Sequence, residues 1–248
     1  MKENKQEAFY QRTEMVLGRA GVERLQSAVV AVCGIGGVGT GAVEALVRAG
    51  VGRLRLIDFD VVSLSNLNRQ LFTTQQNIGK SKVAAMAERI AEIQPACQVE
   101  LLQEKIESNG VARCLQGVDA VIDAIDDIPG KLAILAYAKE QGIFVVSSMG
   151  TGNKLHPELL ELADISQTSV CPLARKLRRE LKKIGIENGI PVVYSKEPPV
   201  PLAIELPPTA KRTPGSVSFV PPVAGMILAG AVIRHLTGKE AGEGNGSF

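Results

Sequence analysis

Four glycines separate a short apolar run from a helical pattern, where a phosphate group could approach the backbone. Gly34, Gly36, Gly37 and Gly39 lie in CGIGGVGTG, directly after the apolar run AVVAV. Because glycine has no Cβ, the chain can turn sharply here and present amide groups at the start of the next helix. The pattern predicts a nucleotide-binding turn between a strand and a helix.

Asp58 follows the next apolar run, RLRLI, at the position where a carboxylate commonly binds a ribose hydroxyl. Its spacing from the glycines fits a dinucleotide fingerprint, and the same arrangement suits ATP. The glycines and Asp58 therefore predict a nucleotide without distinguishing NAD from ATP.

Polar and cationic side chains crowd the segment SNLNRQLFTTQQNIGKSK, which contains Asn66, Arg69, Lys80 and Lys82. A triphosphate carries more negative charge than the pyrophosphate of NAD and usually recruits Lys, Arg and a metal ion. The segment thus favours ATP. Taken singly, Lys80 and Lys82 could equally lie on the charged outer face of a helix.

Three carboxylates end the apolar run AVIDAIDD: Asp123, Asp126 and Asp127. Open α/β sheets bind ligands at the carboxyl ends of their strands, so one of these carboxylates could hold Mg²⁺. The alternative is that they cap the turn into the next helix.

In order and spacing, the motifs GIGGVG, LIDFD, SNLNRQ, GKSK and DAIDD resemble the ThiF/MoeB and ubiquitin-activating-enzyme superfamily. Its members activate carboxylates with ATP. The resemblance runs from about Tyr10 to Ser148 and implies ATP and Mg²⁺ as cofactors. Site residues follow from it by position: Gly36 and Gly39 at the phosphates, Asp58 on the ribose, Asn66, Arg69 and Lys82 on the phosphates, and Asp126 on Mg²⁺.

Arg12 lies in YQRTEMVLG, which is similar to the superfamily segment whose arginine reaches across a homodimer into the partner's ATP site. The resemblance therefore adds Arg12 to the catalytic residues Arg69, Lys82 and Asp126, and it implies a homodimer. Without the resemblance, Arg12 would be a surface charge on an N-terminal helix.

The four cysteines, at positions 33, 97, 114 and 171, form no CxxC pair. Many carrier-protein activators of the superfamily have two such pairs around a structural Zn²⁺, so we expect no zinc here. Cys171 precedes a predicted helix and could be a nucleophile or a sulfur carrier. A plain thiol is the favoured interpretation, because no histidine partner is evident nearby.

The segment PLARKLRRELKKIGI predicts an amphipathic helix with Leu173, Leu177, Leu181 and Ile184 on one stripe. Six cations occupy the remainder against one glutamate: Arg175, Lys176, Arg178, Arg179, Lys182 and Lys183. Such runs are usually solvated helix faces, but the imbalance of charge also suits an anionic partner such as RNA.

Three further pieces, CPLARKLRREL, VVYSKEPP and GSVSFVPPVAGMILAGAVIRHL, resemble the narrower tRNA threonylcarbamoyladenosine dehydratase (TcdA) family. That resemblance implies a tRNA substrate whose threonine carboxylate is activated by ATP and cyclised with loss of water. The alternatives are an adenylyltransferase for the C-terminal glycine of a ubiquitin-like sulfur carrier, and an NAD-binding oxidoreductase or nucleotide-binding module. Association with a cysteine desulfurase or sulfur acceptor, as in some relatives, stays open.

Five strands are predicted from the apolar runs near 28–33, 54–57, 97–102, 120–125 and 143–148. With helices between them, they predict a Rossmann-like, doubly wound α/β fold with a mostly parallel sheet and helices on both faces. An N-terminal helix should extend to about Leu25. Two short strands, VVYS and SVSFV, are expected on either side of an irregular, proline-rich connection, followed by a closing helix.

We expect a single ThiF-like domain over residues 1–240. Its nucleotide-binding core is residues 28–150, its substrate-facing and dimer-associated part is residues 151–240, and residues 241–248 form a disordered tail. The middle of the proline-rich connection is expected to be mobile.

Composition fits an ordinary cytoplasmic enzyme: 45% of the 248 residues are hydrophobic and 22% are charged. A net charge of +2 is too small to imply nucleic-acid binding without local clustering. The N-terminal segment has no apolar core of a signal peptide. The late run VAGMILAGAVI is too short to span a bilayer and is interpreted as a buried helix or a dimer surface, so no membrane partner is expected.

Overall fold

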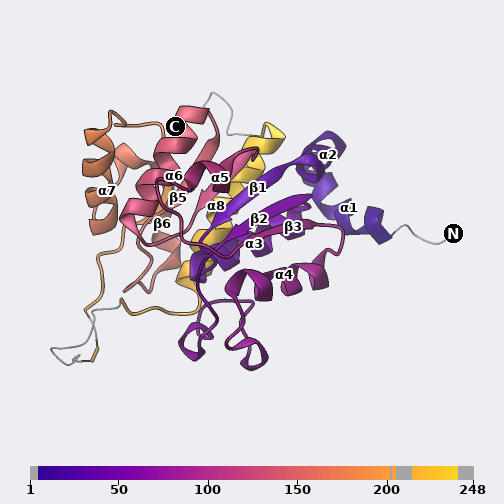
Figure 1. Cartoon of the computed structure of the whole chain (residues 1–248), viewed down its shortest axis with the longest axis horizontal. Helices are drawn as coiled ribbons and strands as arrows, with labels where there is room; N and C mark the ends of the chain where they lie inside the picture. The colour runs from indigo at the N-terminus through magenta and orange to yellow at the C-terminus, as the bar shows by residue number, and fades with distance from the viewer. Residues whose placement is uncertain (1–4, 202, 205–213, 240–248) are drawn as a thin grey trace.

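Seven strands form one sheet that takes members from both halves of the chain (Figure 1). The computed structural model describes residues 5–201, 203–204 and 214–239. The strands are β1 (Val29–Cys33), β2 (Arg53–Ile57), β3 (Gln98–Leu102), β4 (Ala120–Asp123), β5 (Phe144–Ser148), β6 (Leu160–Asp164) and β7 (Pro191–Ser195). They lie in the order β3-β2-β1-β4-β5-β7-β6, and every pairing is parallel except that of β6 with β7. The predicted doubly wound, mostly parallel sheet is therefore confirmed.

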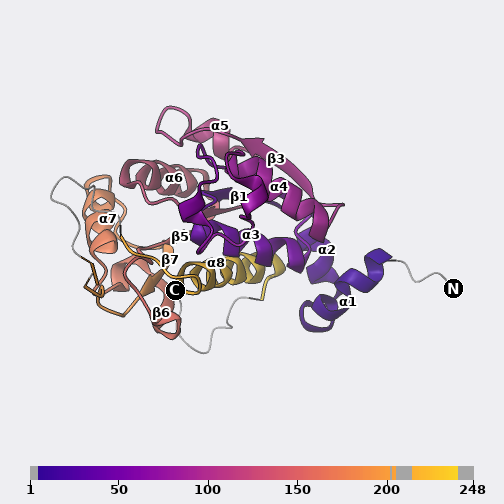
Figure 2. The ribbon, with the colours of Figure 1, turned by 90° about the horizontal axis from the view of Figure 1, so that it is seen from below.

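Helices cover both faces of the sheet. They are α1 (Lys5–Leu17), α2 (Arg19–Ser27), α3 (Gly37–Ala49), α4 (Lys82–Ile93), α5 (Val111–Leu115), α6 (Ile128–Gln141), α7 (Pro172–Lys183) and α8 (Val220–Thr237). Apolar side chains of α3, α4 and α8 form one core cluster with the sheet, and those of α5, α6 and α7 form the other. Figure 2 shows α3 and α8 on one side of the sheet and α5 and α6 on the other.

The strand β1 shows why its sequence is apolar throughout. Val30 and Val32 belong to the cluster under α3 and α8, while Ala31 and Cys33 belong to the cluster under α6. All four side chains are fully buried. A central parallel strand covered on both faces has no solvent side, so its sequence does not alternate between apolar and polar residues.

The closing helix α8 packs directly on α3 through two glycines. A Cβ on Gly41 would lie 2.2 Å from the carbonyl oxygen of Pro222, and one on Gly225 would lie 2.0 Å from that of Val38. The two backbones are therefore in contact. Among the described residues, α8 is the one helix long and apolar enough to cross a membrane, but 56% of it is buried inside the fold. Its packing on α3 accounts for this composition, and the buried-helix interpretation is confirmed.

Two sequence predictions of secondary structure were wrong, and one strand was missed. The segment SVSFV is no strand, because residues 216–219 run irregularly into α8. The N-terminal helix is broken at Gly18, whose φ of +74° separates α1 from α2. The antiparallel edge strand β6 was not predicted at all. The disordered tail expected at 241–248 and the middle of the proline-rich connection lie outside the described residues.

Candidate nucleotide site

The glycine turn between β1 and α3 requires glycine at two positions and leaves a third open. Gly34 has a φ of +88°, and a Cβ on Gly39 would lie 1.8 Å from the Gly34 carbonyl oxygen. Gly36 is different, because a Cβ there would meet nothing within 4 Å. The backbone at Gly36 is therefore accessible beside the start of α3, where helix amides favour an anion. A Cβ on Gly37 would lie 2.9 Å from Pro221, at the start of α8.

Asp58, directly after β2, is hydrogen-bonded to the backbone of this turn. Its Oδ2 accepts a hydrogen bond from the Ile35 amide at 2.6 Å, and its Oδ1 accepts one from the Asp60 amide at 2.8 Å. The side chain is buried, and burial raises the pKa of its carboxyl while the nearby Lys82 ammonium acts in the opposite direction. A carboxylate has two more lone pairs to offer, so Asp58 can still accept a hydroxyl.

Lys82 begins α4 and is almost fully buried. Its Nζ lies 2.6 Å from Oδ2 of Asp60, a carboxylate that is half exposed. Lys80, two residues earlier, pairs with Glu88 on the outer side of α4. The two lysines therefore differ: Lys82 lies near Asp58, whereas Lys80 precedes α4 and pairs with an exposed glutamate of that helix, as its alternative interpretation as a surface charge expects.

Asn66 and Arg69 are held by the irregular segment between β2 and α4. The Asn66 Oδ1 accepts a hydrogen bond from the Ser63 amide at 3.1 Å, which closes a short 3₁₀ turn. Arg69 donates through Nη1 to the Ser65 carbonyl oxygen at 2.9 Å. A Cβ on Gly37 would lie 3.3 Å from Cγ of Arg69, so this arginine reaches the glycine turn.

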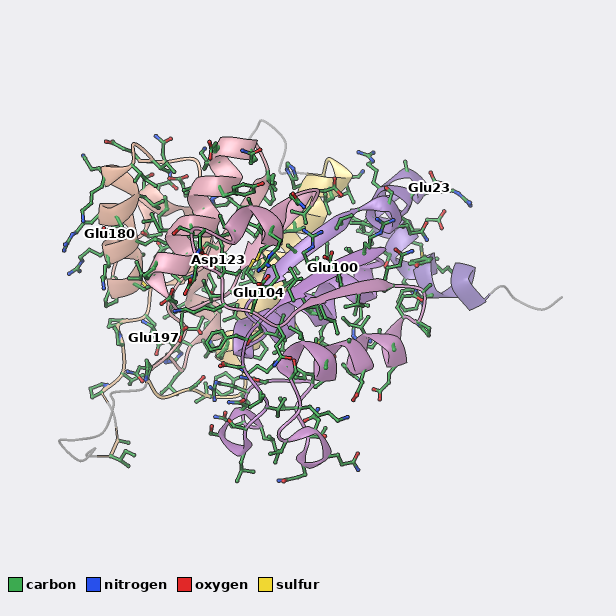
Figure 3. The ribbon with its side chains drawn as sticks, in the orientation of Figure 1. Glu23, Glu100, Glu104, Asp123, Glu180 and Glu197 are labelled. Carbon is green, nitrogen blue, oxygen red and sulfur yellow. The ribbon has the colours of Figure 1, made fainter. Side chains whose placement is uncertain are left out.

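The three carboxylates at the end of β4 and directly after it have three different surroundings. Asp123 is fully buried and pairs with Lys131 at 2.9 Å. Asp127 caps α6, where its Oδ2 accepts a hydrogen bond from the Gly130 amide. Asp126, between them, is exposed, and among the described residues no group pairs with it. Figure 3 shows Asp123 in the middle of the molecule.

This arrangement is compatible with a metal ion that arrives with a nucleotide. Within the described part of the chain, no three His, Cys, Asp or Glu side chains gather as a ready-made metal site. Mg²⁺ is commonly held by one or two carboxylates together with substrate phosphates. Asp126 can supply such a carboxylate without breaking an existing pair.

Three buried side-chain oxygens among the described residues have no hydrogen-bond partner: Oγ1 of Thr40, Oε1 of Gln70 and Oγ of Ser81. Each residue is the direct neighbour in sequence of Gly39, Arg69 or Lys82. Buried polar atoms are normally paired, so unpaired ones deserve an explanation. All three therefore belong to the segments that carry the predicted site residues.

Arg12 lies far from this site in its own chain. It is exposed on α1, which contacts α2 and thus stands at the amino end of β1. Figures 1 and 2 show α1 projecting from the body of the fold. The carboxyl end of β1 carries the glycine turn, so Arg12 and the turn lie at opposite ends of this strand.

The cationic helix α7 lies at the opposite edge of the molecule from α1 (Figure 1). Arg178 is turned inward, where it donates to the Thr168 carbonyl oxygen at 2.9 Å and also bonds the Thr168 hydroxyl. Lys182 and Lys183 pair with Glu187 and Glu180.

The other three cations, Arg175, Lys176 and Arg179, are exposed, and within the described chain none forms an ion pair. The outward charge of α7 is thus smaller than its sequence suggests.

The buried stripe of α7 consists of Ala174, Leu177 and Leu181, whereas the predicted member Ile184 is 49% exposed. Cys171 occupies the N-cap position of the helix and is buried, and it makes no side-chain capping bond. An inaccessible thiol is poorly placed to be a nucleophile or a sulfur carrier.

Sequence reasoning missed Lys131, the partner of Asp123. Both residues are fully buried. The available signal was a lysine within the first turns of the helix IPGKLAILAYAKEQ, eight residues after Asp123.

A glycine turn, a ribose-type carboxylate and cations at the carboxyl edge of a parallel sheet define a nucleotide-binding α/β protein. The chain matches the ThiF family over residues 10–247. It is 39% identical over 238 residues to a tRNA threonylcarbamoyladenosine dehydratase of Bacillus subtilis, covering 92% of this chain and 94% of the relative. The chain therefore belongs to the ThiF family and, within it, to the tRNA threonylcarbamoyladenosine dehydratases.

Solved structures agree with this assignment. The AMP complex of the Escherichia coli dehydratase TcdA superposes with a TM-score of 0.89 at 31% identity, covering 96% of this chain and 98% of that one. The ATP complex of the same protein has a TM-score of 0.86, also at 31% identity, over 98% of this chain and 100% of that one. The family resemblance inferred from the motifs is confirmed.

Proposed function

We propose that this chain uses ATP to cyclise the threonylcarbamoyl group of a modified adenosine in tRNA, with loss of one water. The observation that carries the proposal is the match to the dehydratase family over nearly the whole chain. That match extends over the second half of the chain, whose motifs distinguish the dehydratases from relatives that activate carrier proteins. The glycine turn beside Asp58 supplies the chemistry, because it offers amides to phosphates and an acceptor to a ribose.

The reaction needs a leaving group on a carboxylate. A carboxylate oxygen attacks a phosphorus atom of ATP and yields an acyl-adenylate or an acyl-phosphate, with pyrophosphate or ADP released. An atom of the carbamoyl linker then attacks the activated carbon, and AMP or phosphate departs with the former carboxylate oxygen. The protein's task is positioning and charge neutralisation, so no side-chain nucleophile is required.

We assign the phosphate contacts to the Gly36 and Gly39 amides, Asn66, Arg69 and Lys82, within the turn that Gly34 and Gly37 shape. Asp58 would accept the ribose hydroxyl. Lys82 would exchange its present partner Asp60 for a phosphate or bridge both, because an ammonium has three donors. Asp126 would hold Mg²⁺, which disperses negative charge on the phosphates when bound.

The tRNA is expected to contact α7 through its outward cations, Arg175, Lys176 and Arg179. Lys182 and Lys183 contribute where a phosphate displaces their glutamate partners, whereas Arg178 supports the helix from within. Contacts of this kind position a polyanion and carry little base specificity.

A homodimer would complete the site. Arg12 is exposed and remote from the glycine turn of its own chain, so the superfamily resemblance assigns it to the partner's ATP. Mixed dimers test this assignment: subunits with Arg12→Ala and subunits with Asp126→Ala should each be inactive alone. Combined, they should recover part of the activity, because one of the two sites in each mixed dimer is intact. No recovery, in dimers shown to mix, would exclude the assignment.

We further infer that residues 1–240 form one domain, since one sheet takes strands from both halves. We expect a cytoplasmic enzyme, because its tRNA and ATP are found there. Association with a cysteine desulfurase or sulfur acceptor rests on the superfamily resemblance alone, and co-purification of the full chain with such a partner tests it.

The test of the function is mass spectrometry of nucleosides from threonylcarbamoylated tRNA incubated with the protein, ATP and MgCl₂. The modified adenosine should lose one water in an ATP-dependent manner. The matched controls omit ATP or replace the substrate with tRNA lacking the modification. No loss of water by a protein that still binds ATP would overturn the proposal and direct the search to a carrier protein with a Gly-Gly end.

A further inference from the structure

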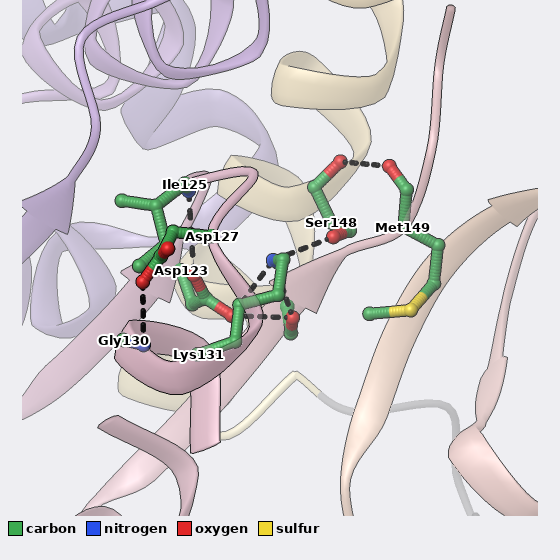
Figure 4. A network of polar contacts seen from close by, with 8 residues as sticks. Asp123, Ile125, Asp127, Gly130, Lys131, Ser148 and Met149 are labelled. Carbon is green, nitrogen blue, oxygen red and sulfur yellow. Dashed lines mark hydrogen bonds and ion pairs between the residues drawn. The ribbon is translucent and has the colours of Figure 1, made fainter. Parts of the chain in front are cut away.

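A fully buried lysine lies beneath the carboxyl edge of the sheet, close to the proposed metal-binding carboxylate. The Nζ of Lys131 donates to Oδ2 of Asp123 at 2.9 Å, to Oγ of Ser147 at 3.2 Å and to the Ser148 carbonyl oxygen at 2.8 Å (Figure 4). An ammonium has three hydrogens, and all three are used. The group therefore has a single, fully satisfied arrangement.

The network joins three elements at one place. Asp123 ends β4, Ser147 and Ser148 end β5, and Lys131 belongs to the first turns of α6. The Ser147 hydroxyl also donates to Oδ2 of Asp123 at 2.6 Å. Removing one partner of a buried ion pair leaves the other charge uncompensated, so these elements cannot shift independently without a large cost.

Asp126 is carried by the short loop that begins at this network. The second carboxylate oxygen of Asp123, Oδ1, which does not contact Lys131, accepts a hydrogen bond from the Ile125 amide at 3.3 Å. On the far side of the loop, Asp127 caps α6 through the Gly130 amide at 2.9 Å. The loop is thus fixed on both sides of Asp126, while the Asp126 side chain itself stays exposed.

The same loop touches the glycine turn. The Ala124 amide donates to the Cys33 carbonyl oxygen at 2.8 Å, and a Cβ on Gly34 would lie 2.9 Å from the Ala124 carbonyl group. A shift of the loop would therefore change the distance between Asp126 and any phosphate bound at the turn.

We propose that Lys131 is a positioning residue for the Asp126 loop and sets the affinity of the site for the Mg²⁺ complex of ATP. The inference rests on the proposed function, because it takes Asp126 as the metal-binding residue. Lys131 contacts neither ligand. It acts through Asp123, which orients the loop, in the way that partners of metal-binding side chains commonly tune a metal site.

The test measures ATP binding by calorimetry over a series of MgCl₂ concentrations and in EDTA, without tRNA, on the full chain. We expect Lys131→Met to raise the MgCl₂ concentration needed for half-maximal ATP affinity roughly tenfold. ATP affinity in EDTA should not change. Ser147→Ala keeps the ion pair but removes the acceptor for Lys131 and the hydroxyl donor to Asp123. It should therefore raise the MgCl₂ concentration for half-maximal ATP affinity by roughly threefold.

The matched control is Ile134→Ala, which truncates a fully buried side chain of the same helix. It should lower the urea midpoint of unfolding and leave the MgCl₂ midpoint at the wild-type value. A folded Lys131→Met protein with a wild-type MgCl₂ midpoint would overturn the proposal.

If Lys131→Met does not fold, an unchanged midpoint in Ser147→Ala overturns it instead. An MgCl₂-independent wild-type protein refutes the role of Asp126 and with it the role of Lys131. The binding measurements use no tRNA, so their outcome does not depend on the dehydration assay. Failure of the proposed function and failure of the role of Lys131 can therefore be distinguished.

Discussion

The glycine turn and the helix α7 present charge in opposite ways. Around the turn, Asp58 and Lys82 are buried, and each has specific hydrogen-bond partners. On α7, Arg175 and Arg179 point into solvent, and among the described residues neither forms an ion pair. In Figure 3, Asp123 lies centrally, whereas Glu180 lies on α7 at the outer edge.

The difference corresponds to two kinds of ligand. A small nucleotide offers few atoms, so its site gains from side chains that are already in place before binding. A tRNA offers many equivalent phosphates, and flexible surface cations can match them without a fixed geometry. Under the proposed roles, the same chain would combine a rigid site for chemistry with an adaptable surface for holding the tRNA.

The largest expected effect concerns the exposed carboxylate in the rigid site. Asp126→Asn should lower turnover by a factor on the order of 10²–10³, because it removes charge stabilisation at the phosphates. The urea midpoint should stay at the wild-type value, since Asp126 is exposed. Single-turnover rates with modified tRNA measure the first quantity. Wild-type turnover in this variant would refute the metal role.

Two alanine substitutions in the glycine turn should differ from each other. Gly36→Ala should weaken ATP binding roughly ten- to hundredfold with little change in stability, because its Cβ would enter the open space in which we place a phosphate. Gly39→Ala should also destabilise the fold, by about 1–3 kcal/mol, since its Cβ collides with the Gly34 carbonyl oxygen. Calorimetry and urea unfolding distinguish them. Equal stability of the two variants would contradict this account of the turn.

On α7 the prediction concerns the dependence of binding on salt. Replacing both Arg175 and Arg179 with alanine should weaken tRNA binding about three- to tenfold at low salt and reduce the salt slope by about 1–2. Filter binding over a range of KCl concentrations measures both.

The matched control is Arg178→Ala, which removes a cation that is bonded to Thr168. It should cost about 1 kcal/mol of stability and leave the salt slope nearly unchanged. A reduction of the slope as large as that of the double variant would show that Arg178 also faces the tRNA.

The smallest expected effect is a pH dependence of ATP binding at the glycine turn, which tRNA binding on α7 should not share. Burial raises the pKa of Asp58 above its ordinary value of 3.8. The stability that this group contributes is therefore fully present below pH 3.8 and is lost as the pH rises through the raised value.

ATP binding should change in the opposite direction, because the ribose hydroxyl needs the charged acceptor. At a pH equal to the raised pKa, half of the Asp58 carboxyls are protonated and ATP affinity should fall about twofold. Binding of tRNA without ATP should show no matching change, since guanidinium and ammonium groups stay charged. Calorimetry from pH 7.5 downward tests this, and Asp58→Asn should remove the dependence.

The sequence predicted the parallel part of the sheet well, because each central strand is a continuous apolar run such as AVVAV or AVID. It did not predict β6, an edge strand whose residues Leu160–Leu162 are only partly buried. Nor did it exclude a strand at SVSFV, whose alternating pattern suits a strand although the segment leads irregularly into α8. Edge strands and connections depend on tertiary neighbours more than on local pattern.

For the site, spacing placed the glycines, Asp58 and Asp126 at one edge of the sheet. It could not separate the roles of neighbouring carboxylates, because the choice between Asp123 and Asp126 depends on Lys131, which reaches Asp123 only through the packing of α6. The inward turn of Arg178 was equally hidden, since its partner Thr168 precedes the helix by several residues and belongs to no recognisable motif.

The contact between α3 and α8 determines at what stage of its synthesis the chain can bind a nucleotide. The helix that carries the glycine turn is made early, but its packing partner is the last helix of the described chain. Until α8 is made, Gly41 and its apolar neighbours on α3 face water, and the contact of Gly37 with Pro221 is missing from the turn. We therefore expect a nascent chain to gain nucleotide binding only once α8 has been synthesised and has packed on α3.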